Sequence, residues 1–147
     1  MGRLVNNYSV FINAEPVAVY DYLADFTKHG EWTEGLTVEA VSDGPTEVGS
    51  EFKSVGRQLG KDVSNDIKVV EASRPARLAF TATDGKADFL QEIDLTESGG
   101  GTLLRRKLSF DANPVLSIAF KLLIGPMFAN PSMNKALGNF KAKLEDS

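Results

Sequence analysis

The stretch KADFLQEIDLTESGGGTLLRRKLSF, residues 86–110, contains two alternating segments separated by a run of glycines. Side chains alternate across a β-strand, so every second residue shares a face. Two such sets follow: Phe89, Gln91, Ile93 and Leu95 in the first segment, and Leu104, Arg106, Leu108 and Phe110 in the second. The glycines at 99–101 suit a tight turn, so the stretch predicts an antiparallel hairpin.

The same alternation recurs upstream and predicts further strands, at residues 8–13, 36–41, 50–58, 61–72 and 77–83. Phe52 is expected to point inwards, although a bulge at Gly56 would reverse the faces beyond it. Between the first two strands, Asn13 is a candidate helix N-cap and Pro16 lies in the first turn of a helix that extends to about Asp25. Residues 25–35 are a polar connection or a second short helix.

A helical period returns at Asn113, which is followed by Pro114. After Pro131 it continues with an apolar stripe of Met133, Leu137, Phe140 and Leu144. Strands joined by tight turns are antiparallel, and only this last helix is large enough to cover their apolar face. The sequence therefore predicts one α+β domain over residues 1–147. It has a curved antiparallel sheet of about six to seven strands, wrapped around a long C-terminal helix, and one or two short helices after the first strand.

Composition excludes several classes of protein. The 147 residues carry a formal net charge of -4, which is unsuited to binding nucleic acid. There is no cysteine, so disulfides and cysteine-ligated metals are excluded, which is compatible with a reducing cytoplasm. No nucleotide-binding motif or metal-spaced histidine cluster occurs, and we expect no cofactor and no metal. His29, the single histidine, lies in the polar stretch TKHGEW and is expected to be a solvated surface residue.

The stretch FKLLIGPMF, residues 120–128, places Gly125-Pro126 inside the most apolar part of the chain. The apolar run from Pro114 to Ala129 is shorter than the roughly 20 residues that cross a bilayer, so no stable membrane insertion is expected. The N-terminus lacks a basic segment followed by an apolar run, so we expect no secretory signal and a cytoplasmic protein. A Gly-Pro pair bends a helix, either as a gate over a cavity or as a plain kink.

The ordered set INAEPVAVYDYLADFTKHGEW, VGSEFKSVGRQLGK, VVEASRPARLAFTATDG, GGGTLLRR and NFKAKLED spans nearly the whole chain. It resembles the START-like (SRPBCC) superfamily, and within it the branch of small bacterial proteins called polyketide cyclase/dehydrase-like. The resemblance implies the helix-grip fold, in which a curved sheet surrounds the C-terminal helix. It also implies a class of ligand rather than one reaction, because the superfamily includes lipid carriers, receptors and cyclases.

Two polar residues, Gln91 and Arg106, fall on otherwise apolar inward faces. A buried arginine without partners is costly. Arg106 therefore either reaches a rim or a structural carboxylate, or orients a mostly apolar ligand together with Gln91. Trp32 either caps the core or contacts that ligand. The predicted cavity residues are Trp32, Phe52, Phe80, Phe89, Gln91, Arg106, Leu108, Phe120, Leu123, Met127 and Phe128.

Three functions remain open at this point. The first is binding of an apolar or amphipathic small molecule between the sheet and the C-terminal helix. The second is a cyclase- or dehydrase-type enzyme that uses the same cavity, with no catalytic residue assigned. The third is a protein-interaction domain with a closed cavity. The expected partner is a hydrophobic ligand, and the expected assembly is a monomer or homodimer.

Overall fold

The computed structural model describes residues 2–33, 35–58, 61–84, 88–112 and 130–145. Seven strands form one sheet, and every neighbouring pair is antiparallel. The elements are β1 (Gly2–Ile12), α1 (Pro16–Ala24), the 3-10 helix η1 (Phe26–Glu31), β2 (Thr37–Ala40), β3 (Glu51–Gln58), β4 (Lys61–Ser73), β5 (Arg77–Thr83), β6 (Asp88–Ser98), β7 (Gly101–Ala112) and α3 (Asn130–Glu145). The predicted fold class and the short helix after the first strand are therefore confirmed. Of the two alternatives for residues 25–35, the second short helix is the one observed, as η1.

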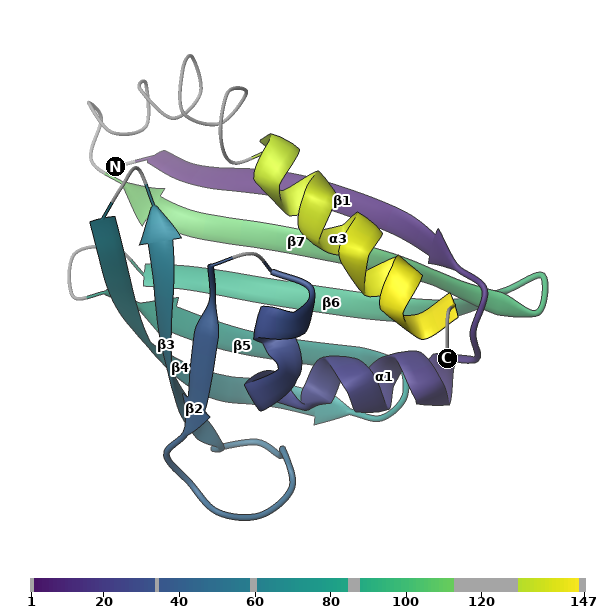
Figure 1. The fold of residues 1–147 in the computed structure, drawn as a ribbon, viewed down its shortest axis with the longest axis horizontal. Helices are drawn as coiled ribbons and strands as arrows, with labels where there is room; N and C mark the ends of the chain where they lie inside the picture. Colours follow the sequence, from purple (N-terminus) through teal and green to yellow (C-terminus); the bar gives the residue numbers. More distant parts are fainter. Residues whose placement is uncertain (1, 34, 59–60, 85–87, 113–129, 146–147) are drawn as a thin grey trace.

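The sheet has the order β1-β7-β6-β5-β4-β3-β2, so the first strand pairs with the last. The strands curl, and α1, η1 and α3 lie against the same face of the sheet (Figure 1). α3 contacts β1, whereas α1 lies against β5, β6 and β7, and η1 lies against β2. We call the face covered by these helices the concave face.

The predicted hairpin is confirmed and consists of β6 and β7. Ser98 pairs with Gly101, and Gln91 pairs with Leu108. In β3 the pairing with β4 is unbroken from Glu51 to Gln58, so the suggested bulge at Gly56 is wrong. An irregularity instead interrupts β4 between Val69 and Glu71. A single extra residue there shifts the alternation of faces by one.

The core lies between the concave face and the helices. Its fully buried side chains come from the sheet, from α1 and η1, and from α3, and the largest include Ile12, Leu23, Phe26, Leu78, Ile93, Leu104 and Phe140. Each such side chain contributes about 1.5–3 kcal/mol relative to an exposed position. The core is therefore what holds the helices on this face.

α1 begins later than the sequence suggested. Pro16 is the first helical residue and Glu15, in extended conformation, is the N-cap, so the prediction of Asn13 as N-cap is wrong. Pro16 fixes its own φ and lacks an N–H, which defines the start of the helix. The Asn13 N–H instead donates to Glu145 Oε2 at 2.8 Å, and this bond ties the end of α3 to the end of β1.

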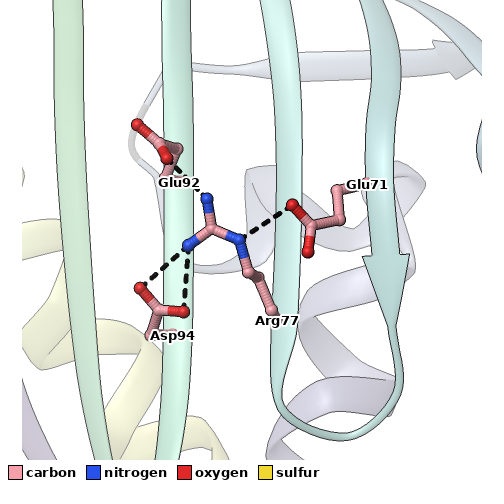
Figure 2. A network of polar contacts seen from close by, with 4 residues as sticks. All are labelled: Glu71, Arg77, Glu92 and Asp94. Carbon is pink, nitrogen blue, oxygen red and sulfur yellow. Dashed lines mark hydrogen bonds and ion pairs between the residues drawn. The ribbon is translucent and has the colours of Figure 1, made fainter.

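The opposite, outer face carries a network of charges around Arg77 (Figure 2). Arg77 Nε donates to Glu71 Oε1 at 2.9 Å, Nη2 to Glu92 Oε2 at 2.5 Å, and Nη1 to Asp94 Oδ1 at 3.0 Å. One guanidinium on β5 thus bridges carboxylates on β4 and β6. These hydrogen bonds hold the pKa of Arg77 above its ordinary value.

Candidate functional site

Three polar side chains are brought together on the concave face by strand register. Arg106 on β7 pairs with Tyr8 on β1 and with Ile93 on β6, and Gln91 lies two residues from Ile93. Two residues along a strand restore the same face, so all three side chains project from one side of the sheet. Arg106 Nε donates to Gln91 Oε1 at 2.6 Å. The expected common face of Gln91 and Arg106 is therefore observed.

Arg106 is almost completely withdrawn from solvent, with 8% of its surface exposed. Among the described residues no carboxylate forms an ion pair with it. Burial lowers the pKa of Arg106 to about 10, and the nearby Tyr8 partly opposes this shift. Arg106 therefore remains charged near neutral pH. The sequence alone allows two structural roles for Arg106, in which its side chain reaches the solvated rim or pairs with a carboxylate. The described residues support neither role.

Trp32 covers this polar group from the side of the helices. Its ring centroid lies 5.8 Å from Arg106 Cζ and 5.0 Å from the centroid of Phe140 on α3. A cation near an aromatic face is attracted to it. Trp32 is 2% exposed, and its Nε1 has no hydrogen-bond partner among the described residues. Trp32 therefore belongs to the core, which agrees with the first of its two interpretations, that of a residue that caps the core. It also lies beside Arg106.

His29 is buried, and the prediction of a solvated surface residue is wrong. Only 5% of it is exposed, and its ring lies 4.5 Å from that of Phe26 and 4.9 Å from that of Trp32. Its Nε2 donates to the Leu23 carbonyl oxygen at 2.7 Å. Burial lowers the pKa of His29 to about 4, so the ring is neutral at pH 7.

The other predicted cavity residues divide into those that the structure describes and those outside the described residues. Phe52 and Phe80 are buried in the core, where their rings lie 4.5 Å and 4.8 Å from that of Phe26. Phe89 is half-buried on the inward face, and Leu108 is buried beside Gln91. Four predicted cavity residues lie outside the described residues: Phe120, Leu123, Met127 and Phe128. Gly125-Pro126 lies outside them too, so its role as a gate or a kink stays a prediction.

Tyr8 and His29 were not among the predicted site residues. Tyr8 shares its face with Val10 and Ile12, but which residue it meets depends on pairing between the first and last strands. His29 had a local signal, because Phe26, His29 and Trp32 are spaced three residues apart. Three residues make one turn of a 3-10 helix, so this spacing places the side chains on one side of η1.

Two hollows are lined by described residues, and the first of them shares Arg106 with the predicted cavity. This hollow, of about 340 Å³, includes the exposed Asn7, Arg105 and Lys107 in its wall, together with Tyr8 and Arg106. The other, of about 460 Å³, includes Thr37 and Lys53. The exposed members of both walls alternate with inward residues, which places these hollows on the outer face. The cavity between the sheet and the C-terminal helix therefore stays a prediction.

A seven-stranded antiparallel sheet with a C-terminal helix and short helices after the first strand defines the helix-grip fold of START-like proteins. Within that class the chain belongs to the family described as polyketide cyclase / dehydrase and lipid transport, whose profile matches residues 6–145. No curated protein matches the chain.

Solved structures share this fold at low sequence identity. TTHA0849 from Thermus thermophilus is 16% identical with a TM-score of 0.80, covering 96% of this chain and 97% of its own. A norcoclaurine synthase point mutant from Thalictrum flavum, in complex with a transition-state analogue, is 11% identical with a TM-score of 0.75, covering 99% and 96%. Ara h 8.0201 is 11% identical with a TM-score of 0.73, covering 99% and 100%.

Among the described residues, no helix has the length and apolar character needed to cross a membrane.

Proposed function

We propose that this protein binds an apolar or amphipathic small molecule between the concave face of the sheet and the C-terminal helix. The observation that supports this most is the buried Arg106 and its hydrogen bond to the half-buried Gln91 on a mostly apolar face. Small-molecule sites are mostly apolar and contain a few polar groups that fix orientation. The family description, which includes lipid transport, is consistent with such a ligand.

The half-buried and inward-facing residues near this pair form the proposed wall. Phe89 and Leu108 flank Gln91, because Phe89 lies two residues before it on β6 and Leu108 pairs with it. Phe52, Phe80 and Trp32 belong to the core, against which Phe89 packs. We retain Phe120, Leu123, Met127 and Phe128 as proposed members of the same wall.

Native mass spectrometry of protein purified under mild conditions tests the binding function. We expect a complex heavier than the 15.9 kDa chain by the mass of a small organic molecule, which organic extraction removes. The extracted and emptied protein should then take up a matching compound with 1:1 stoichiometry. Protein that arrives empty and binds neither fatty acids nor aromatic polyketide-like compounds would argue against the proposal.

An enzyme remains the second candidate, because the Tyr8 hydroxyl group belongs to a residue that pairs with Arg106 across β1 and β7. Burial raises the pKa of Tyr8, with Arg106 opposing the shift, so Tyr8 keeps its proton at neutral pH. A protonated phenol can donate a hydrogen bond or a proton to a carbonyl oxygen. A norcoclaurine synthase shares the fold.

Incubating the emptied protein with the recovered ligand and following its mass separates these two candidates. A carrier returns the ligand unchanged, whereas a cyclase of the dehydrating kind returns a product lighter by one water. Tyr8→Phe should abolish that conversion while leaving binding within a few-fold. An unchanged ligand in the wild-type protein would dismiss the enzyme and leave the carrier.

A further inference from the structure

We infer that the ligand carries a carboxylate, which binds the Nη1 and Nη2 groups of Arg106. This inference rests on the proposed function, since it assigns the chemical class of the molecule that the concave face binds. It starts from the charge balance around Arg106. The protein places a permanent cation on its buried face and, among the described residues, provides no anion there.

Arg77 on β5 and Arg106 on β7 show the contrast. Arg77 on the outer face keeps 27% of its side chain exposed and still has Glu71, Glu92 and Asp94 as ion-pair partners. Arg106 on the concave face is 8% exposed, and its Nε donates a hydrogen bond to the neutral amide of Gln91. Removing a guanidinium from water is costly without a counter-charge. The more buried arginine is therefore the one that lacks compensation.

The described groups around Arg106 are all uncharged at neutral pH. Tyr8 is a protonated phenol, His29 is a neutral imidazole, and Trp32 offers the face of its ring. Glu31, the carboxylate nearest to Trp32 in the sequence, accepts a hydrogen bond from the Tyr22 hydroxyl at 2.9 Å and is exposed. An anion that approached Arg106 would therefore meet no described carboxylate that repels it.

The geometry of the guanidinium selects the shape of the anion. Gln91 Oε1 occupies Nε, which leaves the end of the group with its two Nη nitrogens. That end presents two parallel N–H groups, which match the two oxygens of a carboxylate. Trp32 packs beside the guanidinium and Gln91 holds its Nε, so the end is oriented before a ligand binds. An apolar tail would then lie along Phe89 and Leu108.

Decanoate and decanamide provide a matched pair of probes, because they share a tail and a carbonyl oxygen and differ in charge. We expect wild-type protein to bind decanoate about 10- to 100-fold more tightly in isothermal titration calorimetry at pH 7.5. Arg106→Gln should reduce that preference to within about threefold, while its affinity for decanamide changes little. Arg105→Gln removes a charge from the exposed side of the same strand and should keep the preference.

The fluorescence of Trp32, the sole tryptophan, reports whether either probe reaches the site. Equal affinity of wild-type protein for both probes, with a change in this fluorescence, would overturn the inference and leave the binding function intact. Binding of neither probe, nor of longer homologues of the same pair, would count against the binding function itself. The comparison on wild-type protein requires no variant to fold, so an unstable Arg106→Gln protein would not obscure the result. Loss of the preference in Arg105→Gln would also contradict the assignment to Arg106.

Discussion

His29 is held in its neutral form by the aromatic residues around it, and this makes stability depend on pH. Its pKa is about 4 in the folded protein and about 6.5 in an unfolded chain. Below pH 6.5 the His29 imidazole binds a proton in the unfolded state, whereas in the folded state it stays neutral until the pH falls to about 4. The contribution of neutral His29 is therefore complete above pH 6.5 and is lost as the pH falls towards 4. The loss amounts to about 3 kcal/mol.

His29→Gln tests this dependence, because a glutamine amide can still donate to the Leu23 carbonyl oxygen but does not titrate. Urea denaturation at several pH values between 4 and 7 should give a free energy of unfolding that falls less steeply in the variant than in the wild type. Parallel curves for the two proteins would show that His29 does not titrate in this way. Carboxylates with lowered pKa, such as Asp21, act at lower pH and are common to both proteins.

At the scale of elements, alternation and turn chemistry were sufficient to predict the hairpin of β6 and β7 and the inward position of Arg106. They failed where a residue's surroundings come from another element. His29 has a polar local sequence, yet Phe26 and Phe80 enclose it from η1 and β5. Likewise Tyr8 meets Arg106 through pairing between the first and last strands, which no local pattern specifies. The common inward face of Gln91 and Arg106 followed from alternation, because both lie in one hairpin.

Arg77 on β5 forms ion pairs with carboxylates on both neighbouring strands, β4 and β6. Its removal should therefore destabilise the middle of the sheet. Arg77→Met leaves Glu71, Glu92 and Asp94 close together without a cation. We expect a loss of about 1–2 kcal/mol in the free energy of unfolding, which includes a reduction for solvent screening of this partly exposed group. Added salt should recover part of the loss, because it screens the repulsion among the carboxylates.

The matched control for this variant is Arg74→Met. Arg74 makes hydrogen bonds to Asp21 at 2.8 Å and 2.9 Å, but both side chains are more than half exposed. Exposed ion pairs contribute little, so this variant should lose clearly less stability than Arg77→Met in the same urea titration. Equal losses in the two variants would mean that the network adds nothing beyond an ordinary surface pair.

Two glycines offer a paired test of how closely the elements approach one another. A Cβ at Gly101, where β7 begins, would lie 2.5 Å from the Ile12 carbonyl oxygen and 2.7 Å from Phe11 Cζ. At Gly138 in α3, no heavy atom of the described residues lies within 4 Å of such a Cβ. Gly101→Ala should therefore destabilise the protein by about 1–3 kcal/mol, since the backbone oxygen of β1 has to move. Gly138→Ala should stabilise it by about 0.5–1 kcal/mol through helix propensity.

Thermal unfolding followed by circular dichroism measures both changes. Opposite shifts in Tm are expected, downward for Gly101→Ala and upward for Gly138→Ala. A Gly101→Ala protein with unchanged Tm would show that β1 and β7 do not approach this closely at the hairpin. A lowered Tm in Gly138→Ala would indicate that α3 packs against something at that position.

For the whole molecule, the decisive contact is the one that holds α3 over the concave face. Phe140 is fully buried, and its ring lies 5.3 Å from that of Tyr22 on α1 and 5.0 Å from that of Trp32 after η1. The Asn139 amide adds a hydrogen bond to the Trp32 carbonyl oxygen at 3.3 Å. These contacts hold the C-terminal helix against the two short helices. They also fix the position of Trp32, whose ring lies 5.8 Å from Arg106 Cζ.

Phe140→Ala should remove about 3–5 kcal/mol from the free energy of unfolding and loosen α3 more than the sheet. Hydrogen exchange measured by mass spectrometry should show faster exchange across residues 134–145, while the amides paired between β6 and β7 stay protected. Lys143→Ala, on the exposed side of the same helix, should leave both patterns unchanged. If the sheet exchanged as fast as the helix in Phe140→Ala, the two would unfold as one unit. In that case α3 could not open to admit a ligand without unfolding the sheet, and entry would have to occur elsewhere on the concave face.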